Sequence, residues 1–464
     1  MHLHDLTAVE QAGAIRRGEI SAVRLTEHYL DRIADLNETV GAFALVTPDV
    51  ALAQAQAADA AVSAADDVDA LPVLHGVTVP VKDLNRFAGV RTRMGSLVVD
   101  MVPDVDDDVV AELRRGNTVM TGKTTTPEFG MPAYTESDIG PYARTPWDLS
   151  RGAGGSSGGG ATAVASGLAP VAHGSDGGGS IRIPASGCGI VGLKTTRGLI
   201  SNGPLPEGPG RLGVHGVLAR TVTDTAALLG VMTGTDAAYV RGLSQTMITG
   251  FPRLRIGRYA QPVIADTTPH PETLAAYEEA TALLLELGHE VEEVEVPLGL
   301  DEVPQFEVVW AVGAAGIPLP PEAEEHLRPL TRWLRERGRQ VSAEELERAL
   351  GKMAEVARKA VELTAHVDVV LTPTLADLPA PIGSLRDDDD PAADFEAQKR
   401  FTPYTSPYNM TGQPAISLPL HWTAESLPVG VQLVGRLNEE NVLLALAAEL
   451  EAARPWSHRY PEVW

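Results

Sequence analysis

Cysteine and positive charge are both scarce in this sequence, and each shortage excludes a class of protein. The single cysteine, Cys188, cannot form an internal disulfide, so nothing in the chain requires an oxidising compartment. Only 37 Lys and Arg residues stand against 62 Asp and Glu residues, which gives a net charge of −25 at pH 7. Such a surplus of negative charge disfavours nucleic acids and anionic membrane surfaces as partners.

Long apolar runs are missing as well. The one long stretch without charge, residues 152–175, is rich in Gly, Ser and Ala, so it would make a poor membrane span. The N-terminus, from Met1 to Asp5, lacks the basic and apolar regions of a secretory signal. We therefore expect a cytoplasmic protein that does not bind membranes.

What remains is the composition of a globular α/β protein. The chain is 44% apolar and 21% charged, and a chain of this length can bury roughly 75% of its extended surface. From residue 71 onward, short β-branched runs alternate with helical patterns, beginning with an expected strand at Val77–Val81 and an expected helix at Asp107–Arg115. Further strands are expected at 118–122, 169–173, 254–256, 289–296, 367–371, 415–420 and 430–434, and further helices at 161–167, 223–232, 272–287 and 438–452.

This alternation predicts a layered architecture in one domain, residues 1–464. Within it we expect a helical N-terminal segment (1–65), a core (71–235) and a helical cap or insertion (302–363).

Two acidic runs could be mistaken for metal sites. Asp106, Asp107 and Asp108 suit the N-terminus of a helix, where carboxylates favour the helix dipole. The glycine and the closing glutamate of an EF-hand calcium loop are lacking there. The run from Asp387 to Asp390 is interpreted as an exposed loop. We predict no metal site and no cofactor.

The most informative region is glycine-rich and contains two serine clusters. A phosphate-binding loop would need Gly-Lys-Ser/Thr after the glycines, and this is not found. Residues 155–159 match the G-x-S-x-G nucleophile elbow, with Ser157 at its centre, but the preceding residues 146–151 do not form the hydrophobic strand that an elbow requires. We interpret this match as accidental.

Taken together, the two serine clusters resemble the amidase signature hydrolases. The resemblance is carried by Gly154-Gly155-Ser156-Ser157-Gly158-Gly159, Gly177-Gly178-Gly179-Ser180-Ile181-Arg182-Ile183-Pro184-Ala185 and Cys188-Gly189-Ile190-Val191-Gly192-Leu193-Lys194. Upstream, Val79-Pro80-Val81-Lys82-Asp83 is similar to the family's lysine strand. Residues 126–130, 146–148, 408–417 and 430–433 also fit the family pattern, so the resemblance extends from about residue 5 to 455.

The resemblance implies a fold and a set of site residues. The implied fold is the amidase signature fold, a central mixed β-sheet covered by helices on both faces. Ser180 would be the nucleophile, Ser156 the bridging acid/base on a cis peptide and Lys82 the terminal base. The remaining roles are an oxyanion hole formed by the backbone N–H groups of Gly177, Gly178, Gly179 and Ser180, and a supporting network of Ser157, Asp176 and Arg182.

The lysine places the strictest demand on this mechanism. Lys82 must be neutral to accept a proton, and burial in an apolar strand can lower its pKa. Asp83 is the next residue of the expected strand, so its side chain points to the opposite face and need not pair with Lys82.

Other residues could suggest different chemistry. Cys188 lies in an apolar stretch and is interpreted as a buried structural cysteine rather than a nucleophile. His173 and His215 could suggest a histidine-based triad, although the resemblance already supplies a base. Phe306 and Trp310 share a helical face, and we interpret them as core packing, with stacking on a substrate as the alternative.

The predicted function is hydrolysis of a small or medium acyl amide, anilide or carbamate through an acyl-enzyme, which includes urethanase-like activity. The alternatives are the amidase-like subunit of a tRNA-dependent amidotransferase and a catalytically silent binding protein. The partner would be the small-molecule substrate alone, with a homodimer left open. The substrate pocket is expected in residues 131–140, 204–211 and 302–333, where Trp310, Ile317, Leu319 and Trp333 favour an aryl or long-chain acyl group.

Overall fold

The computed structural model describes residues 2–296 and 298–464, and its centre is a mixed sheet of eight strands. Their spatial order is β4-β6-β5-β10-β11-β9-β7-β8. The strands, in chain order, are β4 (Val171–Asp176), β5 (Val191–Lys194), β6 (Val214–Ala219), β7 (Arg255–Arg258), β8 (Glu290–Glu293), β9 (Val369–Pro373), β10 (Ala415–Trp422) and β11 (Pro428–Gly435).

Neighbouring strands from β4 to β9 pair antiparallel, whereas β7 pairs parallel with both β9 and β8. The sheet is therefore mixed, as predicted. The expected strand at 289–296 is shorter in the structure, because only Glu290–Glu293 pairs with its neighbour. This edge strand carries three glutamates, and charge at an edge discourages pairing with another chain.

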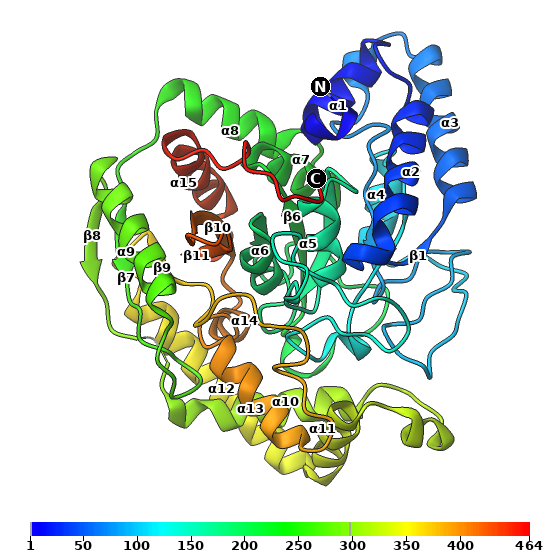
Figure 1. Cartoon of the computed structure of the whole chain (residues 1–464). Coiled ribbons are helices and arrows are strands. Elements are labelled where there is room, and N and C mark those ends of the chain that lie inside the picture. Colours follow the sequence, from blue (N-terminus) through cyan, green and yellow to red (C-terminus); the bar gives the residue numbers. More distant parts are fainter. Residues whose placement is uncertain (1, 297) are drawn as a thin grey trace.

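Helices cover both faces of the sheet (Figure 1). One face packs mainly against α7 (Val222–Met232), α9 (Pro271–Glu286) and α15 (Glu440–Ala453), with residues such as Ile416 and Leu418 buried between them. Alternate strand residues point the other way. That opposite face packs against α5 (Gly158–Ala165) and α6 (Arg182–Cys188).

A second, three-stranded sheet has the order β1-β3-β2 and lies beside the N-terminal helices. Its strands are β1 (Phe43–Val46), β2 (Val81–Lys82) and β3 (Gly122–Thr124). The expected strand at Val77–Val81 is extended, but only its last residue belongs to β2, because Pro80 has no N–H to donate to a ladder. A separate bridge joins Thr78 to Val119.

Most of the remaining helices form two groups in Figure 1. The N-terminal group has α1 (Ala8–Arg16), α2 (Ala22–Val40) and α3 (Pro48–Ala64), which agrees with the predicted helical segment. Beyond one end of the sheet lie the elements of the expected cap. These are α10 (Val303–Ala315), α11 (Pro329–Gln340) and α12 (Ala343–Leu363), joined by α13 (Pro391–Phe401) and α14 (Pro407–Thr411).

The structure also contains α4 (Asp108–Arg115), α8 (Ala238–Thr249) and short 3-10 turns at Leu3–Asp5, Val68–Ala70, Glu128–Gly130, Pro209–Arg211, Leu300–Glu302 and Pro321–His326. Among the described residues, no helix combines the length and the apolar character that crossing a membrane requires.

Candidate active site

Lys82 is brought to the large sheet by two contacts between β2 and β4. The N–H of His173 donates to the carbonyl of Pro80 at 3.2 Å, and the N–H of Lys82 donates to Nδ1 of His173 at 3.4 Å. The side chain of Lys82 is fully buried and reaches the end of β4. There its Nζ donates to the carbonyl and contacts the hydroxyl of Ser175, each at 3.1 Å.

The same amine lies 2.8 Å from the hydroxyl of Ser156. Ser156 precedes α5 and is 1% exposed, and its peptide bond with Gly155 is cis. The next residue ties this loop to the other serine cluster, because the N–H of Ser157 donates to the carbonyl of Ser180 at 3.0 Å. The structure therefore brings the three predicted positions Lys82, Ser156 and Ser180 into one place from three separate parts of the chain.

Burial sets the protonation state of Lys82. Desolvation lowers the pKa of the amine to about 7, and the negative charge of Asp176 opposes this shift only in part. Asp83 does not act on Lys82, because its carboxylate pairs with Lys123 at 2.9 Å. The predicted orientation of Asp83 away from Lys82 is thus confirmed. Because Asp83 pairs with Lys123, its negative charge does not favour the protonated form of Lys82.

Ser180 lies in the turn between β4 and α6 and is 8% exposed, on the wall of a cavity. The turn is stabilised by Asp176, whose carboxylate accepts the N–H groups of Gly179 at 2.8 Å and Ile181 at 3.1 Å. The N–H of Gly179 is therefore already used, which corrects its predicted place in the oxyanion hole. Within residues 2–296 and 298–464, the N–H groups of Gly177, Gly178 and Ser180 make no hydrogen bond.

Asp176 and Arg182 form a fully buried ion pair behind this turn. Two guanidinium nitrogens lie 2.9 and 3.0 Å from the carboxylate oxygens. Burial alone would raise the pKa of Asp176, but Arg182 and the amide of Asn409 hold it below its ordinary value. The pair keeps the turn in shape rather than contacting the open cavity.

Asn409 and Gln432 complete this network, and the sequence analysis gave them no role. The side-chain amide of Asn409 donates to the carbonyl of Asp176 at 2.9 Å, and its oxygen accepts from Arg182 at 2.7 Å. The Oε1 atom of Gln432 accepts from Arg182 at 2.7 Å. Both residues lie in motifs that carried the family resemblance, so the signal was present, but only the fold shows which atoms they contact.

The other candidate nucleophiles and bases are placed elsewhere. Cys188 is fully buried, and burial raises the pKa of its thiol to about 12, as expected for a structural cysteine. His173 and His215 lie 3.0 Å apart through Nε2 and Nδ1, and burial lowers the pKa of both imidazoles. His173 contacts Lys82 only through the backbone, so it positions the lysine strand.

Ser157 is held by Ser175 and not exposed as a nucleophile. Its hydroxyl donates to the carbonyl of Ser175 at 3.1 Å and accepts the N–H of the same residue at 3.3 Å. No strand precedes it, since the residues before α5 form turns and an isolated bridge. The elbow interpretation therefore lacks its structural context.

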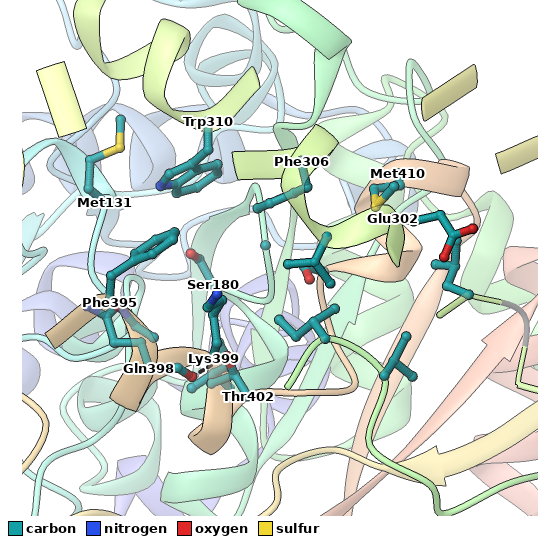
Figure 2. Close-up of a pocket in the computed structure, with 18 of the residues that line it drawn as sticks. Met131, Ser180, Glu302, Phe306, Trp310, Phe395, Gln398, Lys399, Thr402 and Met410 are labelled. Atoms are coloured by element: carbon teal, nitrogen blue, oxygen red, sulfur yellow. Dashed lines mark hydrogen bonds between the residues drawn. The ribbon is translucent and has the colours of Figure 1, made fainter. Parts of the chain in front are cut away.

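The cavity beside Ser180 is lined mainly by apolar side chains (Figure 2). Phe306 and Trp310 stack in its wall with ring centroids 5.5 Å apart. This corrects our interpretation of them as core residues. Three lining positions come from the expected segment at Met131, and the 206–213 loop lines a neighbouring cavity that shares Met131 and Trp310.

The structure adds a wall that the sequence analysis missed, contributed by α13 and by residues near Val263 and Met410. From α13 come Phe395, Gln398 and Lys399, and Thr402 follows directly after this helix. Of the apolar candidates beyond Trp310, Trp333 packs against Phe395 at 5.7 Å between ring centroids instead of lining the cavity. Ile317 and Leu319 do not line it either.

The acidic runs have structural roles. Asp107 is the N-cap residue of α4 and binds Arg86, and Asp390 accepts the N–H groups of Ala392 and Ala393 at the start of α13. In the part of the chain that the structure describes, no cluster of three His, Cys, Asp or Glu side chains could hold a metal ion.

Comparison with known proteins agrees with the fold. The family model described as Amidase matches residues 24–444. The provisionally assigned amidase AmiB2 of Mycobacterium tuberculosis is 37% identical over 98% of both chains. The chain therefore belongs to the amidase family, and it is a hydrolase of carbon–nitrogen bonds.

Solved structures show the same architecture. A 6-aminohexanoate cyclic dimer hydrolase complexed with substrate superposes with a TM-score of 0.90 at 30% identity and covers 99% of both chains. A bacterial aryl acylamidase of the amidase signature family has a TM-score of 0.84 at 24% identity, covering 99% of this chain and 98% of that one. The fold is the amidase signature fold.

Proposed function

We propose that this amidase cleaves small or medium acyl amides, anilides or carbamates through a Ser–cis-Ser–Lys triad and an acyl-enzyme. The observation that carries the proposal is the 2.8 Å contact between Nζ of Lys82 and the hydroxyl of Ser156, at a lysine whose pKa is lowered to about 7 by burial. A neutral amine at this position can accept a proton near physiological pH.

In the proposed first step, Ser180 attacks the carbonyl carbon of the substrate. Its proton passes to Ser156, which passes its own proton to Lys82. The negative charge on the carbonyl oxygen is stabilised by the free N–H groups of Gly177, Gly178 and Ser180. When the tetrahedral intermediate collapses, Ser156 protonates the departing nitrogen and regains a proton from Lys82.

The second step returns the enzyme to its starting state. A water molecule attacks the ester formed on Ser180 and loses a proton to Ser156, which passes its own proton to Lys82. When this second intermediate collapses, the bond to Ser180 breaks, the acid product leaves, and Ser180 regains a proton from Ser156, which takes one back from Lys82. The ion pair of Asp176 and Arg182 keeps the donors aimed at the oxyanion through both steps, because the Asp176 carboxylate fixes the N–H of Gly179.

The substrate range is supported by the shape and lining of the cavity. Stacked aromatic rings and aliphatic side chains surround Ser180, which suits an apolar or aryl acyl group. The related hydrolase of the 6-aminohexanoate cyclic dimer, a compound of amide-linked aliphatic chains, fits the same range.

The test is covalent labelling. A fluorophosphonate should modify Ser180, and peptide mapping should find the adduct on the peptide that contains it. Ser180→Ala should abolish the label and lower kcat by at least about 10⁴-fold. Ser63→Ala, at an exposed serine of α3 outside the cavity, is the matched control and should keep both. An adduct on Ser157 would contradict the proposed triad.

A further inference from the structure

The face of α10 that lines the cavity determines the direction in which a substrate can extend from Ser180. Three cavity residues are spaced four positions apart: Glu302, the N-cap residue of α10, and Phe306 and Trp310 within the helix. This spacing places them in a row along one side of α10. At about 1.5 Å of rise per residue, the row is about 12 Å long. The cavity therefore extends along the helix.

One end of this row packs against the turn between β4 and α6, which contains Gly177, Gly178 and Ser180. A β-carbon placed on Gly177 would lie 3.4 Å from the ring of Trp310, and one placed on Gly178 would lie 3.8 Å from the ring of Phe306. Glu302 is one helical turn further from Trp310, about 6 Å beyond Phe306 along the axis. Figure 2 shows Glu302 on the side of the cavity away from Met131 and Phe395.

The carboxylate at the far end lacks a positive partner. Its Oε2 accepts the N–H of Gly299 at 2.9 Å, and among the described residues no Lys, Arg or His lies within 4.0 Å of it. Lys399, the cation in the cavity wall, is already paired with Glu307 at 2.6 Å and Glu396 at 2.5 Å. Of the two charged side chains that the structure describes in the cavity lining, Glu302 is thus the one without an opposite charge.

The cavity that holds Ser180 suits the acyl half of the substrate. The acyl group stays bonded to Ser180 after the first step, whereas the amine must leave. Met131 and Trp310 also line the second cavity, formed with the 206–213 loop, which offers space for the departing amine. The carbon chain of the acyl group would then extend along Phe306 toward Glu302.

We propose that Glu302 is a specificity-determining residue that binds a cationic group at the end of an aliphatic acyl chain. The favoured substrates would be amides of ω-amino acids, with the ammonium ion at the carboxylate of Glu302 and the methylenes between the apolar walls. This inference rests on the proposed function, because it assumes that Ser180 carries the acyl group.

The experiment compares three p-nitroanilides that differ only at the end of the acyl chain: 6-aminohexanoyl, hexanoyl and adipoyl. In the unmodified enzyme, kcat/KM should be highest for the 6-aminohexanoyl compound and lowest for the carboxylate-ended adipoyl compound. Glu302→Gln should lower kcat/KM for the 6-aminohexanoyl compound by about 10- to 100-fold, the loss of one charge-assisted hydrogen bond, and change hexanoyl turnover by less than about twofold.

Two further variants separate charge recognition from structural damage. Gln keeps an oxygen that can accept the N–H of Gly299, so the turn before α10 is preserved. Asp301→Asn removes the same charge one residue away, outside the cavity, and should leave the substrate ratios unchanged. Glu302→Lys should reverse the order and favour the adipoyl compound, which a merely damaged pocket would not do.

The outcomes are distinct. The inference is overturned if Glu302→Gln leaves the ratio of kcat/KM for the 6-aminohexanoyl and hexanoyl compounds unchanged. It is also overturned if Asp301→Asn shifts this ratio as much as Glu302→Gln does. In both cases the proposed function stands, provided that the unmodified enzyme cleaves the hexanoyl compound. Equal cleavage of the 6-aminohexanoyl and hexanoyl compounds by the unmodified enzyme would overturn the assignment of this cavity to the acyl half. If no anilide is cleaved and no probe labels Ser180, the proposed function fails and this inference with it.

Discussion

On one side of Ser180 the side chains are polar, buried and paired, whereas on the other side the cavity wall is apolar and held by partly exposed ion pairs. The first region contains Lys82, Asp176 and Arg182, all with 0% exposure. In the second, α10 and α13 are joined by Lys399 and Glu307, whose side chains are 14% and 16% exposed.

The difference reflects what each region has to do. In the proposed mechanism the turn at Ser180 holds three N–H donors in one direction. A buried network with its hydrogen bonds satisfied gives such rigidity at the cost of desolvation. In the proposed function the cavity wall fits an acyl group. A substitution of an apolar side chain in this wall leaves no buried charge unpaired. The two regions should therefore respond differently to substitution.

Among the variants that compare these two regions, the largest effect is expected from Lys82→Arg. Arginine keeps the positive charge but cannot lose a proton in the working range, so kcat should fall by at least about 10³-fold. In the unmodified enzyme kcat/KM should rise with pH through an apparent pKa near 7, because burial lowers the pKa of Lys82 to about 7 and only the neutral amine is active. A pH–rate profile with circular dichroism as a folding control tests this. Near-normal turnover of Lys82→Arg would make Lys82 a structural cation.

Ion pairs in the two regions should differ in their contribution to stability. Asp176→Asn leaves the fully buried Arg182 without its counter-charge and should lower the free energy of unfolding by about 3 kcal/mol or more. Lys399→Met breaks the partly exposed pair with Glu307 and should cost about 1 kcal/mol or less. Urea unfolding of both variants measures the contrast, and equal losses would contradict it.

Lys82, the proposed base, should itself reduce stability at neutral pH. Its folded pKa of about 7 lies below the ~10.4 of an unfolded chain, so between these values the unfolded state binds more protons and stability rises with pH. Lys82→Met should therefore be more stable than the unmodified protein near pH 7, by on the order of a few kcal/mol, and the gain should shrink toward pH 10. Unfolding curves at several pH values test the trend, which a gain independent of pH would contradict.

The smallest effect should come from chelation. The proposed steps pass protons only between Ser180, Ser156 and Lys82, so EDTA should leave kcat/KM unchanged. Assays before and after EDTA, with added divalent ions as the control, test this. Activity lost to EDTA and restored by one specific ion would contradict the proposed steps.

Much of the fold and the chemical centre could be predicted from the sequence because both are encoded locally. The alternation of short β-branched runs and helical patterns indicated an α/β sheet, and the glycine–serine spacing marked Ser156 and Ser180. Strand geometry alone predicted that Asp83 would point away from Lys82, and in the structure it pairs with Lys123.

Only the tertiary structure decided the rest. The sequence cannot show that Gly179 donates to Asp176 instead of remaining free, because this depends on how the turn between β4 and α6 closes. A helical spacing of Phe306 and Trp310 is equally consistent with a core and with a cavity wall, and the packing of α10 against Gly177 and Gly178 decides between them. Asn409 and Gln432 contact Arg182 across more than 200 residues of the chain. Glu302 lines a cavity formed by several distant segments. The roles of all three therefore follow from the way distant elements pack.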